Sequence, residues 1–366
     1  MPGGATGCAR GQRQGGAMLI AHNQLEDFVR RILLAAGSSE QEAGIVAGHL
    51  VRANLTGHDS HGVGMVPTYM KNLANETLRP NAVLEKILDR GAILQFDAHR
   101  GYGQRLAKEA MAQAIERCRE SGLVMLTVRN AHHIGRVGAY AEQALQAGLV
   151  SLMFVNVTDH RPLVAPQRGS DARFATNPVC IGFPAAENQR EVLLDMATSK
   201  VALGKVRVAM NKNERMAQGT LFDGQGQATT DPTVMFEEPF GAITPLGEHK
   251  GYGLALLCEL LAGGLSGGGT IQPDTPRRGG IVNNLMAILI DPQALVDLSW
   301  LRQEAEKLIA YVKESPAANP AEPVLIPGDP ERLSERERRE GGVPIDPTTW
   351  GQLTEIAHSL KVEVPG

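Results

Sequence analysis

The chain has 366 residues, a length that suits two or three packed subdomains and allows a large core. Its formal net charge of −4 provides no positive excess with which to bind nucleic acid or an anionic membrane, so neither partner is expected. The 4 cysteines are far apart and form no C-x-x-C pair, which argues against a zinc ribbon, a redox dithiol or a disulfide framework.

The N-terminus and the hydropathy pattern point to a cytoplasmic protein. No apolar run approaches the roughly 20 residues of a membrane-spanning helix, and the opening residues lack the apolar centre of a signal peptide. Residues 1–17 are Gly-rich and without apolar periodicity, so we predict a disordered tail, with Met18 as an alternative start.

Apolar residues recur at helical spacing near the N-terminus and predict a helical hairpin. The first helix covers Leu25–Leu33 and ends before Gly37. Ser39 and Glu42 have the spacing of a capping box, and the second helix continues from there through Ala53.

Strand and helix patterns alternate in the middle of the chain, which predicts an α/β region. Helices are expected at Gln104–Glu120, Val137–Ala147, Leu254–Leu261, Leu301–Val312 and Trp350–Leu360. Strands are expected at Leu123–Val128, Leu149–Val157, Val179–Phe183, Val192–Met196 and Leu285–Ile290. The Gly-rich run 263–269 is expected to be a flexible loop.

No nucleotide-binding fingerprint of the usual kinds is present. Neither G-x-G-x-x-G nor G-x-x-x-x-G-K-[ST] occurs in the sequence. Any dinucleotide must therefore be held by other backbone amides.

The segment 57–64 places two histidines, a carboxylate and a hydroxyl between glycines. An imidazolium can protonate a carbonyl oxygen during reduction because its pKa lies near the operating pH, and His61 is the candidate donor. The alternative is a capped turn in which Asp59 and Ser60 satisfy backbone groups.

The segment 130–138, NAHHIGRVG, follows an expected strand and opens an expected helix. A helix N-terminus offers free N–H groups, so Gly135, Arg136 and Val137 can cradle a phosphate there. The alternative is an ordinary strand-to-helix turn. The adjacent histidines do not have the spacing of a zinc site, so we expect no metal.

Two further polar segments adjoin expected helices. Asp195 ends a strand and can orient an imidazole or hold a ribose hydroxyl, or else cap a helix near Lys200. His249 and Lys250 stand at a glycine-flanked helix entry, where they can reach an anionic ligand.

Together and in this order, the segments resemble the type-2 malate/L-lactate dehydrogenase family, and most closely its bacterial hydroxycarboxylate dehydrogenases. The resemblance rests on GHDSHGVGM (57–65), NAHHIGRVG (130–138), ATNPVCIGFP (175–184), LLDMATS (193–199), GEHKGYG (247–253) and IPGDPE (326–331).

The resemblance implies an α/β (α+β) fold: a helical domain beside a non-Rossmann α/β nicotinamide-binding domain with a largely antiparallel sheet, usually in a homodimer. On this chain the helical domain is expected over 18–90 and 299–366, and the NAD(P)-binding domain over 91–298.

The resemblance also implies site residues. His61 is expected to be the proton donor and to touch the nicotinamide of NAD or NADP, with His133 as a second polar group at the reacting centre. The expected cofactor contacts are Gly135, Arg136, Val137, Leu193, Leu194, Asp195, Met196, Ala197, His249, Lys250, Asn283, Gly328, Asp329, Pro330 and Glu331.

One position departs from the family pattern. Many relatives carry an arginine where this chain has Met65, and that arginine can bind the substrate carboxylate. We hypothesise that Arg161 replaces it. Met65 can instead line a roomier apolar pocket that favours an aromatic or longer 2-oxo acid.

The expected activity is NAD(P)H-dependent reduction of a 2-oxo acid to a 2-hydroxy acid, with phenylpyruvate and hydroxyphenylpyruvate as possible substrates. Alternatives within the family are a malate/L-lactate-type dehydrogenase and a reductase of a cyclic imine acid or sugar-derived oxo acid. From other classes, a metal-dependent hydrolase and a ligand-binding protein without turnover stay open.

Overall fold

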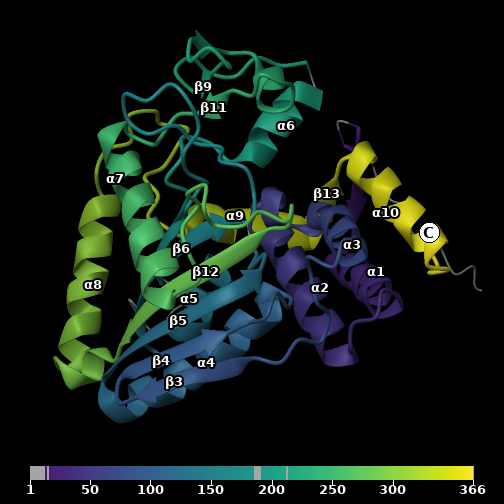
Figure 1. Ribbon diagram of the computed structural model, residues 1–366. Coiled ribbons are helices and arrows are strands. Elements are labelled where there is room, and N and C mark those ends of the chain that lie inside the picture. Colours follow the sequence, from purple (N-terminus) through teal and green to yellow (C-terminus); the bar gives the residue numbers. More distant parts are fainter. Residues whose placement is uncertain (1–12, 15, 185–190, 212, 366) are drawn as a thin grey trace, which may run out of the picture. The chain divides into compact units, whose positions relative to one another are not determined.

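The computed structural model describes residues 13–14, 16–184, 191–211 and 213–365. They form two compact units (Figure 1). One unit contains Met1–Lys71 and Pro330–Gly366, and the other contains Asn72–Asp329. Most of the expected disordered tail lies outside the described residues, but β1 (Arg13–Gln14) pairs with β2 (Ala17–Ile20).

The first unit is built on the expected helical hairpin. In α1 (His22–Ala35) the five apolar residues of the predicted face, from Leu25 to Leu33, are buried. The predicted N-cap of α2 (Glu40–Leu55) is confirmed, because Ser39 Oγ accepts a hydrogen bond from the Glu42 amide at 3.3 Å. The remaining elements of this unit are α3 (Val66–Ala74, whose last turn enters the second unit), α9 (Asp329–Gly341), β13 (Val343–Ile345) and α10 (Pro347–Ser359).

The second unit is built on a seven-stranded sheet of order β3-β4-β5-β12-β6-β7-β8. Every neighbouring pair is antiparallel except β4 and β5, so the expectation of a largely antiparallel sheet is confirmed. Its strands are β3 (Glu85–Arg90), β4 (Ile93–Asp97), β5 (Leu123–His132), β6 (Val150–Thr158), β7 (Val179–Phe183), β8 (Val192–Met196) and β12 (Val282–Ile290).

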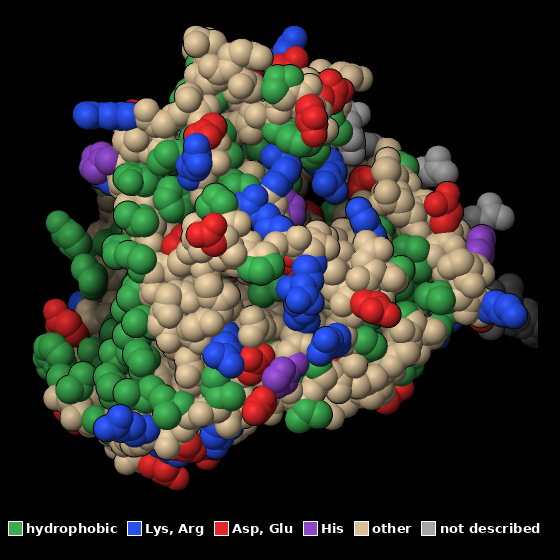
Figure 2. Space-filling view, viewed as in Figure 1, with side chains coloured by type: hydrophobic (Ala, Val, Ile, Leu, Met, Phe, Trp, Pro, Cys, Tyr) green, Lys and Arg blue, Asp and Glu red, His purple; other side chains and the backbone are tan. Residues whose placement is uncertain are grey.

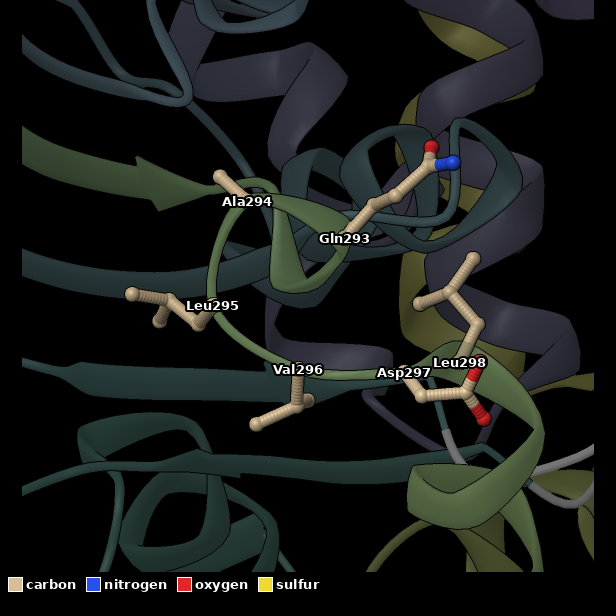
Figure 3. A pocket seen from close by; sticks show the side chains of 6 residues that line it. All are labelled: Gln293, Ala294, Leu295, Val296, Asp297 and Leu298. Carbon is tan, nitrogen blue, oxygen red and sulfur yellow. The ribbon is translucent and has the colours of Figure 1, made fainter.

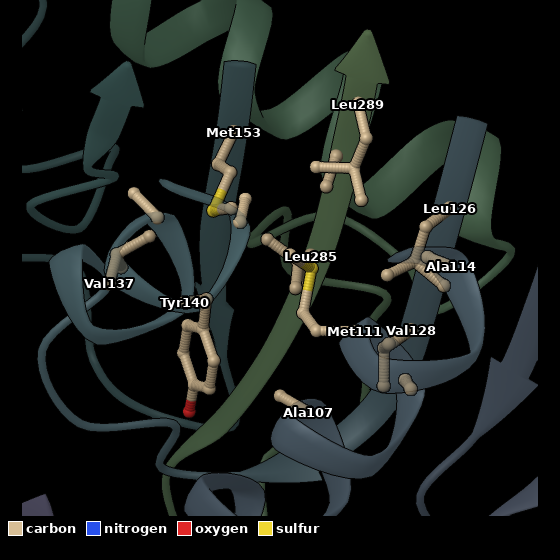
Figure 4. Close-up of a cluster of buried hydrophobic side chains, with 14 of the residues drawn as sticks. Ala107, Met111, Ala114, Leu126, Val128, Val137, Tyr140, Met153, Leu285 and Leu289 are labelled. Carbon is tan, nitrogen blue, oxygen red and sulfur yellow. The ribbon is translucent and has the colours of Figure 1, made fainter. Parts of the chain in front are cut away.

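Helices cover both faces of this sheet. On one face, α4 (Gly103–Ser121) and α5 (Gly138–Gln146) bury their apolar sides in the main core, and Met111 and Tyr140 belong to the same cluster as Leu285 (Figure 4). On the other face, α7 (His249–Cys258) packs against β6, and the π-helix that continues it (Glu259–Gly264) packs against β6 and β12. The π-helix occupies the start of the Gly-rich run that we expected to be a loop.

A smaller sheet, β10-β9-β11, has its own apolar cluster around Leu163, Leu221 and Met235. Its strands are β9 (Leu221–Phe222), β10 (Ala228–Thr229) and β11 (Ala242–Ile243), and α6 (Leu203–Asn211) contributes Val206 to the same cluster.

The unit boundaries differ from those expected. Residues 72–90 lie in the second unit because β3 pairs with β4, and residues 299–329 lie there because α8 (Leu298–Lys313) packs on the edge of the large sheet. Ile309 of α8 contacts an apolar cluster that includes Phe183 and Val192.

Candidate functional site

The loop that carries His61 is fixed within the first unit by polar contacts. Arg338 holds the Asp59 carboxylate with two hydrogen bonds, at 2.7 and 3.0 Å. Asn54 donates to Asp59 at 2.7 Å and accepts from the Val63 amide at 2.8 Å. The alternative interpretation of a simple capped turn is therefore incomplete, because Asp59 binds side chains from two helices. His61 lies half-buried at the end of this turn.

The other histidine of the loop has a partner as well. His58 Nε2 lies 3.2 Å from Glu331 Oε1, so the carboxylate expected to contact a cofactor is already hydrogen-bonded inside the first unit. Met65 lies half-buried in the same unit, at the end of a 3-10 turn.

In the second unit, the two adjacent histidines at the end of β5 are both buried. His132 Nε2 accepts a hydrogen bond from the Asn72 amide group at 2.8 Å. Burial, with the nearby positive charge of Arg100 as a smaller cause, lowers the pKa of His132 to about 3. His132 is therefore neutral at physiological pH, and His133, which is 7 % exposed, begins the turn expected to contact the cofactor.

Arg136, one of the three residues expected to cradle a phosphate, has a buried side chain. Its side chain is 1 % exposed and forms an ion pair with Glu142 on α5. The structure thus pairs this guanidinium with a carboxylate in the interior.

Asp195, which is distant in sequence from α5, caps the N-terminus of that helix. Its Oδ2 accepts a hydrogen bond from the Gly138 amide, the first residue of α5, at 2.7 Å. The alternative that Asp195 caps a helix at Lys200 is wrong, because α6 begins only at Leu203.

Backbone hydrogen bonds join the other expected cofactor segments of this unit. The Leu193 amide donates to the Pro327 carbonyl at 3.1 Å, and the Leu246 amide donates to the Thr198 carbonyl at 2.9 Å. Gly251 packs closely against Leu246 and Thr198. A Cβ at Gly251 would lie 2.4 Å from the carbonyl oxygen of each of these two residues. Segments 135–138, 193–198, 246–251 and 326–328 therefore form one connected region.

Solvent exposure varies among the residues expected to contact the cofactor. His249 and Lys250 are exposed at the start of α7, and Leu194–Ala197 are partly exposed. Asn283 is 3 % exposed, and its side chain binds the Ile134 amide and the Asn156 carbonyl instead of pointing to solvent. Asp329 is ion-paired with Lys313 at 2.6 Å.

The turn after β6 brings positive charge to the same end of the central strands as His133. Val282 of β12 pairs with His132 of β5 on one side and with Thr158 of β6 on the other. The residues that follow β5 and β6 therefore lie at the same end of the sheet. Asp159 fixes this turn by accepting from Arg100 at 2.6 Å and from the Arg278 amide.

The charges of three arginines, Arg161 in this turn and Arg207 and Arg277 from other segments, act on His160. Arg161 lies over the Phe240 ring at 4.2 Å and donates to the Met235 carbonyl, and Arg207 lies over the adjacent Phe236 at 5.5 Å. Burial, and then the charges of these two and of Arg277, lowers the pKa of His160. None of these three arginines is ion-paired with a carboxylate among the described residues. Arg207 and Arg277 were not predicted from the sequence, since only the fold brings them near residue 160.

Other features of the described residues offer less chemistry. A surface hollow is lined by Gln293–Leu298, between β12 and α8 (Figure 3), and its Asp297 carboxylate caps α8. Burial raises the pKa of Cys258 to about 12, which makes this thiol a poor nucleophile. No group of three His, Cys, Asp or Glu side chains in the described part of the chain is placed to bind a metal ion, and no described helix is long and apolar enough to cross a membrane.

Comparison with known proteins gives one consistent result. A sequence model of the family described as malate/L-lactate dehydrogenase matches residues 20–354. The chain is 41 % identical to hydroxycarboxylate dehydrogenase B of Escherichia coli over 92 % of each chain. It is 40 % identical to L-lactate dehydrogenase of Cupriavidus necator over 95 % of this chain and 99 % of the relative. The solved structure of a putative malate/lactate dehydrogenase from E. coli superposes with a TM-score of 0.90 at 39 % identity, covering 94 % of this chain and 96 % of that one.

Proposed function

Because the chain belongs to the malate/L-lactate dehydrogenase family, and is thereby an oxidoreductase of 2-hydroxy acids, we propose that it reduces a 2-oxo acid to a 2-hydroxy acid with NADH or NADPH, and catalyses the reverse. The observation that carries this proposal is the connected region of the second unit, where four segments far apart in sequence are joined by hydrogen bonds.

The residues of this region suit a dinucleotide. Exposed His249 and Lys250 at the start of α7 provide donors and positive charge for a phosphate, and the partly exposed 194–197 segment provides backbone groups. The close packing at Gly251 leaves no room for a side chain between the segments. A bound reduced nicotinamide supplies the hydride in this chemistry.

The chain's own part in the reaction is to bind the acid and to move a proton. His61 donates the proton to the carbonyl oxygen of the substrate, and His133 is a second polar group that orients that oxygen. In the reverse direction His61 accepts the proton of the hydroxyl group.

The substrate carboxylate is bound by Arg161. One support is that its turn lies at the same end of the central strands as His133. The other is that Arg161, Arg207 and Arg277, whose charges act on His160, have no carboxylate partner among the described residues. Arg161 uses one side of its guanidinium for the Met235 carbonyl, and a guanidinium has five donors in all.

Replacing Arg161 with alanine is expected to raise KM for the 2-oxo acid by about 10- to 100-fold, the effect of losing hydrogen bonds to a charged group. KM for the nicotinamide cofactor should change little. Arg173→Ala is the matched control, because Arg173 is exposed and its ion-pair partner among the described residues is Asp171. An unchanged substrate KM in Arg161→Ala discards this assignment.

Met65 supports a preference for an aromatic or longer 2-oxo acid, since a thioether side chain adapts to apolar groups. The test follows NADH and NADPH absorbance with pyruvate, oxaloacetate, phenylpyruvate, hydroxyphenylpyruvate and a cyclic imine acid. Highest kcat/KM for the aromatic acids supports the preference, and highest kcat/KM for oxaloacetate, pyruvate or the imine favours the corresponding family alternative. No oxidation of either cofactor with any compound would contradict the proposed function.

We further propose that the protein is a homodimer. Apolar side chains are exposed on one side of the second unit, over α7 and α8 (Figure 2). They include Leu256, Leu257, Leu260, Trp300, Leu308 and Tyr311. Such a surface is more typical of an interface than of a monomer. Light scattering should give the mass of two chains, and the mass of one chain would refute the dimer.

A further inference from the structure

The second unit contains a buried carboxylate that is hydrogen-bonded to two asparagines. Glu259, the first residue of the π-helix, is 3 % exposed. Its Oε1 accepts a hydrogen bond from the Asn177 side chain at 2.8 Å. Its Oε2 accepts from the Asn156 side chain at 2.8 Å and from the Ile271 amide at 3.0 Å. Burial raises the pKa of Glu259, and these three N–H donors, which favour the ionised carboxylate, oppose that rise.

Glu259 is the centre of a hydrogen-bonded network with two arms, one through Asn156 and Asn284 and the other through Asn177. The first arm leads to the segment before His133. Asn156 accepts at 2.9 Å from the Asn284 side chain, whose oxygen accepts from the Asn130 amide at 3.0 Å. Asn130 has φ of +55°, in the left-handed region that asparagine adopts more readily than most non-glycine residues, and its amide is held there by Asn284.

The same segment interrupts the sheet ladder. The pairing of β12 with β5 shifts register between Asn283 and Leu285, and at this irregularity the side chains of Asn283 and Asn284 accept from the Ile134 and Asn130 amides. Asn283 and Asn284 therefore hold backbone amides on both sides of His133.

The second arm leads to the other side of the region. Asn177 also has a positive φ, and its carbonyl accepts from Thr198 Oγ at 3.0 Å. Thr198 follows the 193–197 segment and binds the Leu246 amide through its carbonyl. Both arms begin at Glu259.

Glycines in the 263–269 run allow this arrangement. A Cβ at Gly263 would lie 2.6 Å from Asn156 Nδ2, and one at Gly268 would lie 1.9 Å from Asn284 Oδ1. These glycines thus serve close packing on the asparagines, a role that the sequence pattern did not indicate.

We propose that Glu259 is a positioning residue for this enzyme, which holds the 130–134 and 176–198 segments in the geometry that binds the cofactor and places His133. The proposal rests on the proposed function for the identity of the cofactor. The network itself can be tested without turnover.

Glu259→Gln separates the two arms. Oε2 accepts two hydrogen bonds and Oε1 accepts one, so the glutamine should keep its oxygen toward Asn156 and Ile271 and turn its NH2 group toward Asn177. Two donors then face each other in the Asn177 arm alone. Asn284→Ala has the complementary effect, because it removes the acceptor of the Asn130 amide and leaves Glu259 intact.

The experiment measures hydrogen exchange and the Kd for NADH on folded protein. We expect faster exchange at 176–178 in Glu259→Gln and at 130–134 in Asn284→Ala, with a rise in Kd of about 10-fold in each, since small misplacements at a site have large effects. Leu289→Ala is the control: it opens a cavity in β12 on the other face of the sheet and should lower stability without changing Kd.

Wild-type Kd and wild-type exchange in both variants would overturn the proposal. So would a Kd increase in Leu289→Ala as large as that in the other two, because the effect would then follow general stability. If all variants and the wild type bind NADH but reduce no 2-oxo acid, the proposed function fails and the positioning role stands. If one variant does not fold, the other still supports or refutes the role of its own arm.

Discussion

Turnover of a 2-oxo acid is expected to fall by about 10²–10⁴-fold in His61→Ala, the usual range for loss of a general acid. The physical reason is that negative charge develops on the carbonyl oxygen during reduction, and without an imidazolium that charge must be neutralised by water. Binding of the cofactor should persist, because the connected region of the second unit is unchanged. The measurement is steady-state kcat beside the Kd for NADH.

The structure of the loop makes this test informative. The loop is held by Asp59, Asn54 and Arg338, none of which is altered by the substitution, so the fold of the first unit should survive. His358→Ala serves as the control, since His358 is an exposed histidine of α10 in the same unit. Near-normal kcat in His61→Ala would rule out the donor role, and a loss of NADH binding would show that the residue acts on the cofactor instead.

Local patterns were enough to predict much of the fold. The apolar face from Leu25 to Leu33, the cap at Ser39 and the strands Val179–Phe183 and Val192–Met196 all occur as expected. In each case the signal lies within a few neighbouring residues, as periodicity, as a side-chain cap or as a short apolar run.

Elements without such local signals were missed. In β3 five of six residues are exposed, so an edge strand of sequence EKILDR shows no alternation. Helix α9 has no buried residue, and its run of Arg and Glu has no apolar face to detect. The register with neighbouring strands and the contacts of Asp59 with Arg338, 279 residues away, exist only in the folded chain.

In the candidate site, too, features with a local sequence signal were predicted and features that depend on tertiary contacts were not. Motifs singled out candidate segments, and hydrogen bonds join those of the second unit. They did not predict what individual side chains do: Arg136 and Asn283 are turned inward, and Glu259 carries no motif. Buried polar partners are chosen by tertiary geometry, which a pattern of neighbouring residues does not contain.

Acid is expected to destabilise the protein at a pH well above the range in which carboxylates titrate, because of His132. Its pKa is about 3 in the folded protein and near the ordinary value of 6.5 when the chain is unfolded. Below pH 6.5 the unfolded chain therefore binds a proton that the folded protein does not, so stability is full above that pH and falls as pH drops toward 3. The complete effect approaches about 5 kcal/mol, of which about 2 kcal/mol is lost between pH 7.5 and 5.0.

Chemical denaturation at pH 7.5 and 5.0 measures this loss, with His132→Gln as the comparison. A glutamine oxygen can accept the hydrogen bond from Asn72 but binds no proton in this range, so the variant should lose about 2 kcal/mol less than the wild type between the two pH values. His160, whose pKa is also lowered by burial, contributes with the same sign and stays in both proteins. His358→Gln, an exposed histidine, should behave like the wild type. Equal losses in the wild type and His132→Gln would show that His132 becomes protonated in the folded state, and would contradict a neutral imidazole bound to Asn72.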